Sequence, residues 1–182
     1  MKRIEVSNDA YTSWVSKGYE HFSEFGPTQM SIRKISKEIK LPRTSFYYYF
    51  ENQSEYLKEL EMKHKEDVSD FFQELERREA YSCSEFFRVL EKYSLILKFQ
   101  NQLFKNREED SCNELFLKVY DELFEKILCR RIPKNHSTKS AKKVMLLSIE
   151  VWFSRLQLEK MTIKEKQGNL QEIMNTMSLV FN

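Results

Sequence analysis

The sequence predicts an all-α protein, in which a three-helix N-terminal head is joined by a long helix to a helical C-terminal body. The 182 residues include only three glycines and three prolines, which leaves little material for the tight turns of a β-sheet. Apolar residues recur at helical spacing, and no segment of useful length alternates with the period of two typical of strands. Four segments also open with a polar residue followed three positions later by Glu, a helix start signal.

Short elements separated by turn residues make up the first fifty residues. A first helix ends at the Gly26-Pro27 pair, and Ser31 is predicted to cap a second short helix. Residues 40–42 then form a tight turn, which places Pro42 in the first turn of a third helix. Two short helices across a tight turn, followed by a long capped helix, are typical of a helix-turn-helix.

Capping boxes are predicted to start the longer helices. In each, the first side chain accepts from a free backbone N–H, while the Glu accepts from the N–H of the cap residue. The four pairs are Asn52/Glu55, Ser82/Glu85, Ser111/Glu114 and Thr162/Glu165. We expect the head to span residues 1–52 and the body 53–182, with the last two helices at about 139–160 and 163–181.

The segment TSFYYYF, residues 44–50, is predicted to expose its tyrosines. Because Phe46 and Phe50 are four residues apart, they share one helix face, which we assign to the core. Tyr48 then points directly away from the core. The exposed patch is expected to comprise Arg43, Thr44, Ser45, Tyr47, Tyr48 and Tyr49. Tyr47 or Tyr49 could equally pack between helices, with its hydroxyl bonded internally.

Exposed aromatic side chains indicate a binding partner. A phenol can donate to a phosphate oxygen and place its ring edge against sugar or a thymine methyl. From Thr28 to Arg43 there are five basic residues and one acid, Glu38. Taken alone, this basic run favours a solvated helix surface. Beside the tyrosines, it indicates double-stranded DNA as the partner.

The segment from Trp14 to about Leu60, a quarter of the chain, resembles the TetR family of bacterial transcriptional regulators. Its SIRKISKEIKLPRTSFYYYFENQSEYL follows the family pattern Thr-Val-Arg-x-Ile-Ala through Leu-Tyr-x-His-Phe without a gap. Together with the basic run, the resemblance implies a DNA-binding surface made of Arg33, Lys34, Arg43, Thr44, Ser45, Tyr47, Tyr48, Tyr49 and Gln53.

Three residues depart from the family pattern. Lys40 stands where the turn usually has Gly, so either Lys40 carries the left-handed strain or the turn differs from that of the family. Gln53 replaces a usual Lys and removes one charge that would face phosphate. Gly18 stands where Ala is common, which is expected to weaken the first helix by up to about 1 kcal/mol.

The resemblance also implies that the body binds a small-molecule effector, whose identity it leaves open, and forms a homodimer through its last two helices. The expected effector pocket is lined by Phe86, Leu90, Tyr93, Phe116 and Tyr120. The expected dimer interface comprises Val144, Val151, Trp152, Leu170, Met174, Met177 and Phe181. The alternative is that these apolar stripes only close the protomer's own core.

The rest of the sequence limits the other functions. Three widely spaced cysteines without a C-x-x-C pair favour reduced thiols over disulfides or a zinc site. No apolar run approaches the roughly 20 residues of a membrane span, and the first ten residues lack an apolar signal core. We therefore expect a cytoplasmic protein without cofactor, metal or membrane association.

The leading hypothesis is a ligand-responsive regulator, a repressor that binds a palindromic operator as a dimer and is released by its effector. The alternative is a protein of the same fold that acts as a co-regulator, through a protein partner at the tyrosine patch. An enzyme is not expected, because the three histidines are scattered and no H-E-x-x-H motif, phosphate loop or nucleophile elbow is present. His21 and His64 are expected on exposed helix surfaces.

Overall fold

The computed structural model describes residues 2–79, 82–131 and 137–178, and within these ranges it is helical and contains no strand. The all-α prediction is confirmed. The α-helices are α1 (Lys2–Phe25), α2 (Ile32–Glu38), α3 (Phe46–Tyr49), α4 (Gln53–Arg77), α5 (Cys83–Lys92), α6 (Ser94–Lys105), α7 (Asp110–Lys126), α8 (Thr138–Arg155) and α9 (Ile163–Ser178). Short 3₁₀ turns lie at Pro27–Gln29, Arg43–Ser45 and Leu128–Arg131.

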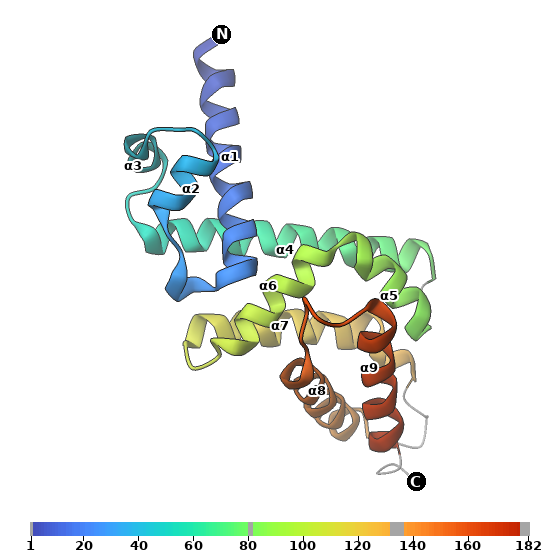
Figure 1. Ribbon diagram of the computed structural model, residues 1–182. Helices are drawn as coiled ribbons and strands as arrows, with labels where there is room; N and C mark the ends of the chain where they lie inside the picture. The colour runs from blue at the N-terminus through green and yellow to red at the C-terminus, as the bar shows by residue number, and fades with distance from the viewer. Residues whose placement is uncertain (1, 80–81, 132–136, 179–182) are drawn as a thin grey trace.

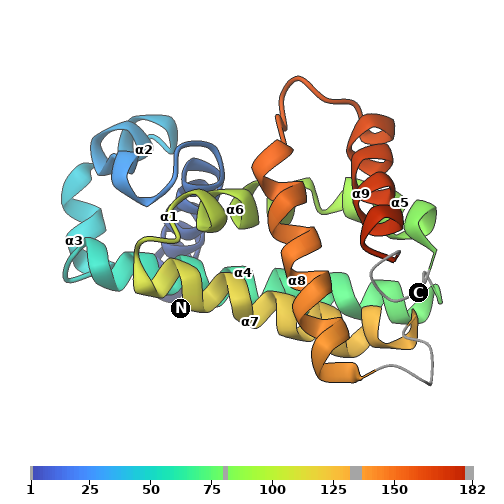
Figure 2. The same ribbon diagram turned by 90° about the horizontal axis from the view of Figure 1, so that it is seen from below.

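The long helix α4 connects the two parts of the molecule. Helices α1 to α3 gather around its N-terminal end, and its C-terminal half lies among the helices of the body (Figure 1). In the body, α4 and α7 lie side by side, and α8 pairs with α9 (Figure 2). Helix α1 packs extensively against α6 as well as α4, so the head rests directly on the body.

Three of the four predicted capping boxes start helices. The Asn52 side chain accepts from the Glu55 N–H at 2.9 Å, and the Ser82 hydroxyl caps α5 in the same way. Before α9 both halves of the box are present, since the Glu165 N–H donates to Thr162 Oγ1 and the Thr162 N–H donates to Glu165 Oε2. These side chains fix where α4, α5 and α9 begin.

The prediction that the fourth capping box, Ser111/Glu114, starts a helix is wrong. Helix α7 begins at Asp110, with Glu109 as its N-cap, and therefore Ser111 lies inside the first turn. The acidic side chain of Asp110 in that turn interacts favourably with the positive end of the helix dipole. The helix consequently starts earlier than the hydroxyl pattern alone indicates.

The core of the head is built around Trp14, Phe46, Phe50 and Tyr56, each at most 1% exposed. The Tyr56 hydroxyl donates to the Trp14 carbonyl oxygen at 2.5 Å. This bond brings the Tyr56 ring against α1 at Gly18, where a Cβ atom would lie only 1.8 Å from the Tyr56 hydroxyl. The absence of a side chain at Gly18 thus leaves room for the Tyr56 ring. The sequence alone did not reveal this reason for a glycine in the helix.

Lys40 adopts a left-handed conformation with φ of 56°, so it carries the strain of the turn. A non-glycine residue there costs roughly 1–2 kcal/mol. Two hydrogen bonds hold the turn closed around it: the Leu41 N–H donates to the Ser36 carbonyl at 3.1 Å, and the Ser36 hydroxyl donates to the Leu41 carbonyl at 2.7 Å. The turn therefore keeps its geometry without glycine.

Both histidines expected on the surface are buried, so that prediction is wrong. His64 stacks on Phe99 of α6, with 4.1 Å between ring centroids, and its Nδ1 lies 2.8 Å from the Tyr19 hydroxyl of α1. Burial, reinforced by the neighbouring charges of Lys65 and Lys63, lowers the pKa of His64 to about 3 and keeps it neutral. His21 is buried because α1 is covered by neighbouring helices on more than one side.

Within the described ranges, no helix combines the length and the apolar character that crossing a membrane would require.

Candidate DNA-binding surface and body pocket

Residues 43–49, here called the tyrosine segment, follow the turn after α2. Pro42 starts the 3₁₀ turn Arg43–Ser45, with φ of −63°, and α3 continues directly from it. The Ser45 N–H donates to the Pro42 carbonyl at 2.9 Å, which fixes the change of direction. Phe46 and Phe50 then anchor the segment in the head core, as the spacing predicted.

The outer side of the tyrosine segment is strongly exposed. Tyr48 is 78% exposed and Tyr47 is 55% exposed, and Arg43 and Thr44 lie on the same surface. Their predicted exposure is confirmed. The Arg43 Nη2 donates to the Tyr47 hydroxyl at 3.3 Å, so the guanidinium and the phenol are held as a pair. The patch presents one cation, two phenols and a hydroxyl to a partner.

Ser45 and Tyr49 turn partly inward instead. The Ser45 hydroxyl accepts from Trp14 Nε1 at 3.1 Å and donates to the Pro42 carbonyl at 2.8 Å. The structure contradicts its placement on the exposed patch, because the bond from Trp14 ties it to the head core and the bond to Pro42 closes its own turn. Tyr49 is half-buried, with its ring edge-to-face against Tyr11 at 5.9 Å. Of the two tyrosines that could pack between helices, Tyr49 is the one that does.

The basic side chains of α2 do not all face the same way. Arg33, Lys37 and Lys40 are exposed. Lys34 is exposed too, but its ammonium group lies 5.6 Å from the centroid of the Phe25 ring, beside α1. The one acid of the basic run, Glu38, pairs with Lys17 of α1 at 3.1 Å, so its charge is countered on that side.

Gln53 is exposed at the first position of α4, directly after the Asn52 cap. The free backbone N–H groups and the positive dipole end of α4 lie there, and both favour an anion such as phosphate. The uncharged Gln53 adds no positive charge to this terminus, and the carboxylate of Glu55, which accepts from the Glu51 N–H, lies in the same first turn.

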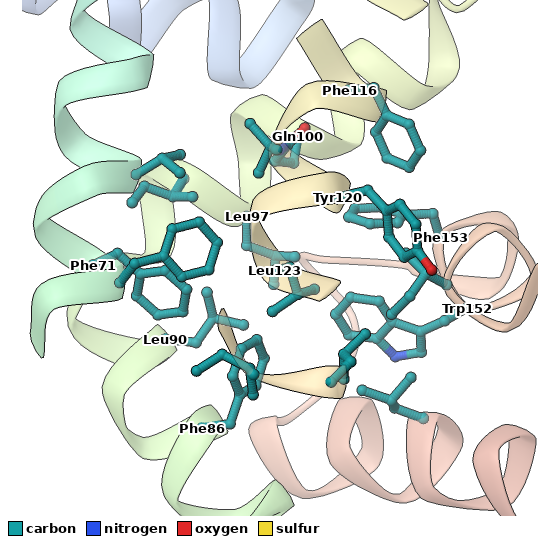
Figure 3. Close-up of a pocket in the computed structure, with 18 of the residues that line it drawn as sticks. Phe71, Phe86, Leu90, Leu97, Gln100, Phe116, Tyr120, Leu123, Trp152 and Phe153 are labelled. Carbon is teal, nitrogen blue, oxygen red and sulfur yellow. The ribbon is translucent and has the colours of Figure 1, made fainter. Parts of the chain in front are cut away.

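A cavity of about 120 Å³ lies in the body, among α4 to α9. Figure 3 shows Phe71 and Trp152 on opposite sides of this body pocket, with Gln100 at one end and Phe86 at the other. Four of the five predicted pocket residues line it: Phe86, Leu90, Phe116 and Tyr120.

Tyr93 does not line the body pocket, so that part of the prediction is wrong. It is half-buried at the junction of α5 and α6, and its ring packs edge-to-face against Phe71, with centroids 5.5 Å apart. Helix α5 ends at Lys92, so Tyr93 no longer follows the helical spacing that places Phe86 and Leu90 at the pocket wall.

Sequence reasoning missed much of the pocket wall, notably residues of α4, α6 and α8. The unpredicted residues include Val68, Phe71, Phe72, Leu97, Gln100, Ile149 and Phe153. One signal was present: Gln100 follows Leu97 by three residues and precedes Phe104 by four, so a polar side chain falls on an apolar helix face.

The predicted dimer interface is only partly at the surface. Trp152 is 3% exposed, and its Nε1 donates to the Lys166 carbonyl at 3.0 Å. Leu170 is buried as well, and both residues line the body pocket, so their assignment to an interface is wrong. The side chains of Met174 and Met177, and all of Phe181, lie outside the described part of the chain.

The surface of α8 offers an apolar residue that the sequence analysis did not select. Leu147 is 53% exposed. It lies three residues after Val144 and four before Val151, which are half-buried on the same face. By contrast, the exposed positions of α9 that the structure describes are polar, glycine or charged.

Among the described residues, no three His, Cys, Asp or Glu side chains converge as metal ligands would.

Comparison with solved structures reveals close architectural relatives. The chain superposes on a regulatory protein TetR from Rhodobacter sphaeroides with a TM-score of 0.67 at 18% identity, covering 92% of this chain and 96% of the other. A transcriptional regulator from Aquifex aeolicus VF5 gives 0.63 at 17% identity, covering 91% and 98%. A Rhodococcus protein described as a TetR-family transcriptional regulator gives 0.61 at 9% identity, covering 91% and 96%. No protein-family model and no curated protein matches the sequence significantly.

Proposed function

Because this chain has the fold of the TetR-family transcriptional regulators, we propose that it is a cytoplasmic, ligand-responsive repressor. In this proposal two copies bind a palindromic operator in double-stranded DNA, and a small effector in the body releases them. Residues 1–52 form the DNA-binding domain, and residues 53–182 form the domain for effector binding and dimerisation.

The observation that carries the proposal is the exposure of Tyr48, which is 78% open to solvent next to Tyr47, Arg43 and Thr44. A protein gains nothing in stability from large exposed aromatic side chains, so their presence points to a partner. The partner is DNA because phenols, a hydroxyl and a guanidinium together match phosphate oxygens, thymine methyl groups and guanine edges.

In the proposed complex the tyrosine segment enters the major groove. Tyr48 and Thr44 face the base edges, and the Arg43–Tyr47 pair contacts a phosphate or a guanine. Arg33 and Lys37 supply positive charge from α2, while the N-terminus of α4 at Gln53 binds a backbone phosphate. Ser45 and Tyr49 position the segment from inside the head.

Dimerisation is proposed through the face of α8 that carries Val144, Leu147 and Val151. Leu147 is the exposed centre of this face, and burying it against a second copy is favourable. Two heads held in this way would reach successive major grooves, about 34–36 Å apart, which matches a palindromic operator.

Helix α6 provides a path by which an effector could move the head. Its Phe99 stacks on Tyr19 and Phe22 of α1, with centroid distances of 4.7 and 4.1 Å. The next residue, Gln100, lines the body pocket. A ligand that binds more tightly to one position of α6 would therefore favour one position of α1, and with it one spacing of the two heads.

The experiment that tests DNA recognition replaces Thr44 and Tyr48 together with alanine. We expect affinity for a DNA fragment from upstream of the protein's own gene to fall by at least about 30-fold, because each of the two heads loses at least one contact of roughly 1 kcal/mol or more. Both side chains are exposed, so stability should change little. Electrophoretic mobility shift or fluorescence anisotropy measures the affinity.

The matched control is Met62→Ala, which removes a 49% exposed apolar side chain from α4 outside the head. Its DNA affinity should equal that of the unmodified protein. If the Thr44/Tyr48 variant binds the fragment as tightly as the control does, the tyrosine segment is not the reading surface.

A further inference from the structure

Among the described residues that line the body pocket, none has a charged side chain. Its walls are aliphatic and aromatic, with Phe71, Phe116, Phe153 and Trp152 contributing ring faces and edges. A carboxylate, phosphate or ammonium group placed there would lose its hydration without gaining an opposite charge. The chemistry of these described walls thus favours neutral ligands over ionic ones.

One buried polar residue, Gln100, lies at the wall of this apolar space. Gln100 is 6% exposed, and within the described residues its Oε1 has no hydrogen-bond partner. The other polar groups of the inner wall are satisfied, since the Tyr120 hydroxyl donates to the Lys142 carbonyl and Trp152 Nε1 donates to the Lys166 carbonyl. Buried acceptors are almost always bonded, so an orphan at a cavity wall indicates a ligand donor.

The size of the cavity limits the ligand. Its volume is about 120 Å³. An apolar cavity of roughly 150 Å³ is known to hold benzene, so one aromatic ring is the scale that fits. Half-buried Phe86, Val119 and Leu123, with exposed Gln171 nearby, mark the side that opens toward solvent.

We propose that the body pocket binds a small, neutral, single-ring aromatic compound that carries one O–H or N–H donor, as phenols and anilines do. The ring packs among the aromatic walls, and the donor bonds to Gln100 Oε1. The inference rests on the proposed function only in treating this ligand as the effector. Because Gln100 follows Phe99 on α6, the bond would form next to the residue on which the head rests.

The test compares three probes of one ring, namely phenol, toluene and benzoate, by isothermal titration calorimetry. In the unmodified protein, phenol should bind and benzoate should not. The Gln100→Leu variant should lower the ratio of phenol to toluene affinity by at least about tenfold, the scale of one hydrogen bond. Toluene should still bind the variant, which shows that the pocket remains folded.

Three results would overturn the inference: the same phenol-to-toluene ratio in both proteins, binding of benzoate as tight as that of phenol, or no binding of phenol and toluene. DNA release is measured separately, by adding phenol to the complex with the upstream fragment. If phenol binds through Gln100 but DNA stays bound, the pocket chemistry holds and the release step of the proposed function fails. If the protein binds no DNA, the calorimetry still decides the ligand class.

Discussion

Alanine at Gly18 is expected to destabilise the protein by about 3 kcal/mol, although alanine in a helix normally stabilises relative to glycine by roughly 0.5–1 kcal/mol. The new Cβ would lie 1.8 Å from the Tyr56 hydroxyl and 2.5 Å from Cζ of the same ring. Tyr56 is fully buried and donates to the Trp14 carbonyl, so it cannot move aside without breaking the head core. Urea denaturation followed by circular dichroism gives the change in unfolding free energy.

Gly168 provides the matched control, since it lies in α9 with no atom within 4 Å of an added Cβ. Gly168→Ala should stabilise the protein by roughly 0.5–1 kcal/mol. A second comparison combines Gly18→Ala with Tyr56→Phe, which removes the closest atom and should recover part of the loss. Equal effects of alanine at the two glycines would show that Tyr56 does not occupy the space beside Gly18.

Glutamate at Leu147 is expected to turn the proposed dimer into a monomer and to lower affinity for the upstream DNA fragment by about 100-fold or more. The substitution places a charge at the centre of the α8 face, where association would strip its hydration without pairing it. A monomer binds DNA through one head only, so it lacks the high effective concentration at which the second head of a dimer binds. Analytical ultracentrifugation measures the oligomeric state and anisotropy the affinity.

Leu95→Glu is the matched control, because Leu95 is also exposed, at 38%, but lies at the start of α6. This variant should remain a dimer and keep its DNA affinity. If the Leu147 variant stays dimeric and binds DNA as tightly as the unmodified protein, dimerisation runs through another surface.

Local spacing was enough to predict the features that depend on one helix. The inward faces of Phe46 and Phe50 and the outward face of Tyr48 follow from the periodicity of the segment itself. The caps at Asn52 and Thr162 likewise involve residues three apart. Such features depend on residues that are close together in the sequence.

The features that were missed depend on contacts between distant helices. Ser45 is drawn inward by Trp14, 31 residues away, and His64 by Tyr19, 45 residues away. Trp152 was assigned to an interface because its helix stripe is apolar, yet Phe87 and the Lys166 carbonyl enclose it within the protomer. Periodicity predicts that a face is buried, but it does not tell which partner buries it.

The body pocket shows the same limit. The stripe from Phe86 to Leu90 indicated an apolar wall, whereas the unpaired acceptor of Gln100 becomes evident only when its surroundings are assembled. In the sequence, a glutamine within a helix is unremarkable. Its isolation becomes evident only when α6 is packed among the other helices of the body.

The most direct measurement is the affinity of the protein for its upstream DNA fragment as a function of salt concentration. If Arg33, Lys37, Arg43 and the α4 N-terminus of two heads contact phosphates, affinity should fall by about 10³- to 10⁴-fold between 50 and 200 mM salt, as expected for some six to eight phosphate contacts. A protein partner at the tyrosine segment predicts no such DNA complex. Two results would contradict the assignment of this surface to DNA. The protein could bind neither this fragment nor other genomic fragments, or its affinity for them could stay constant as the salt concentration rises.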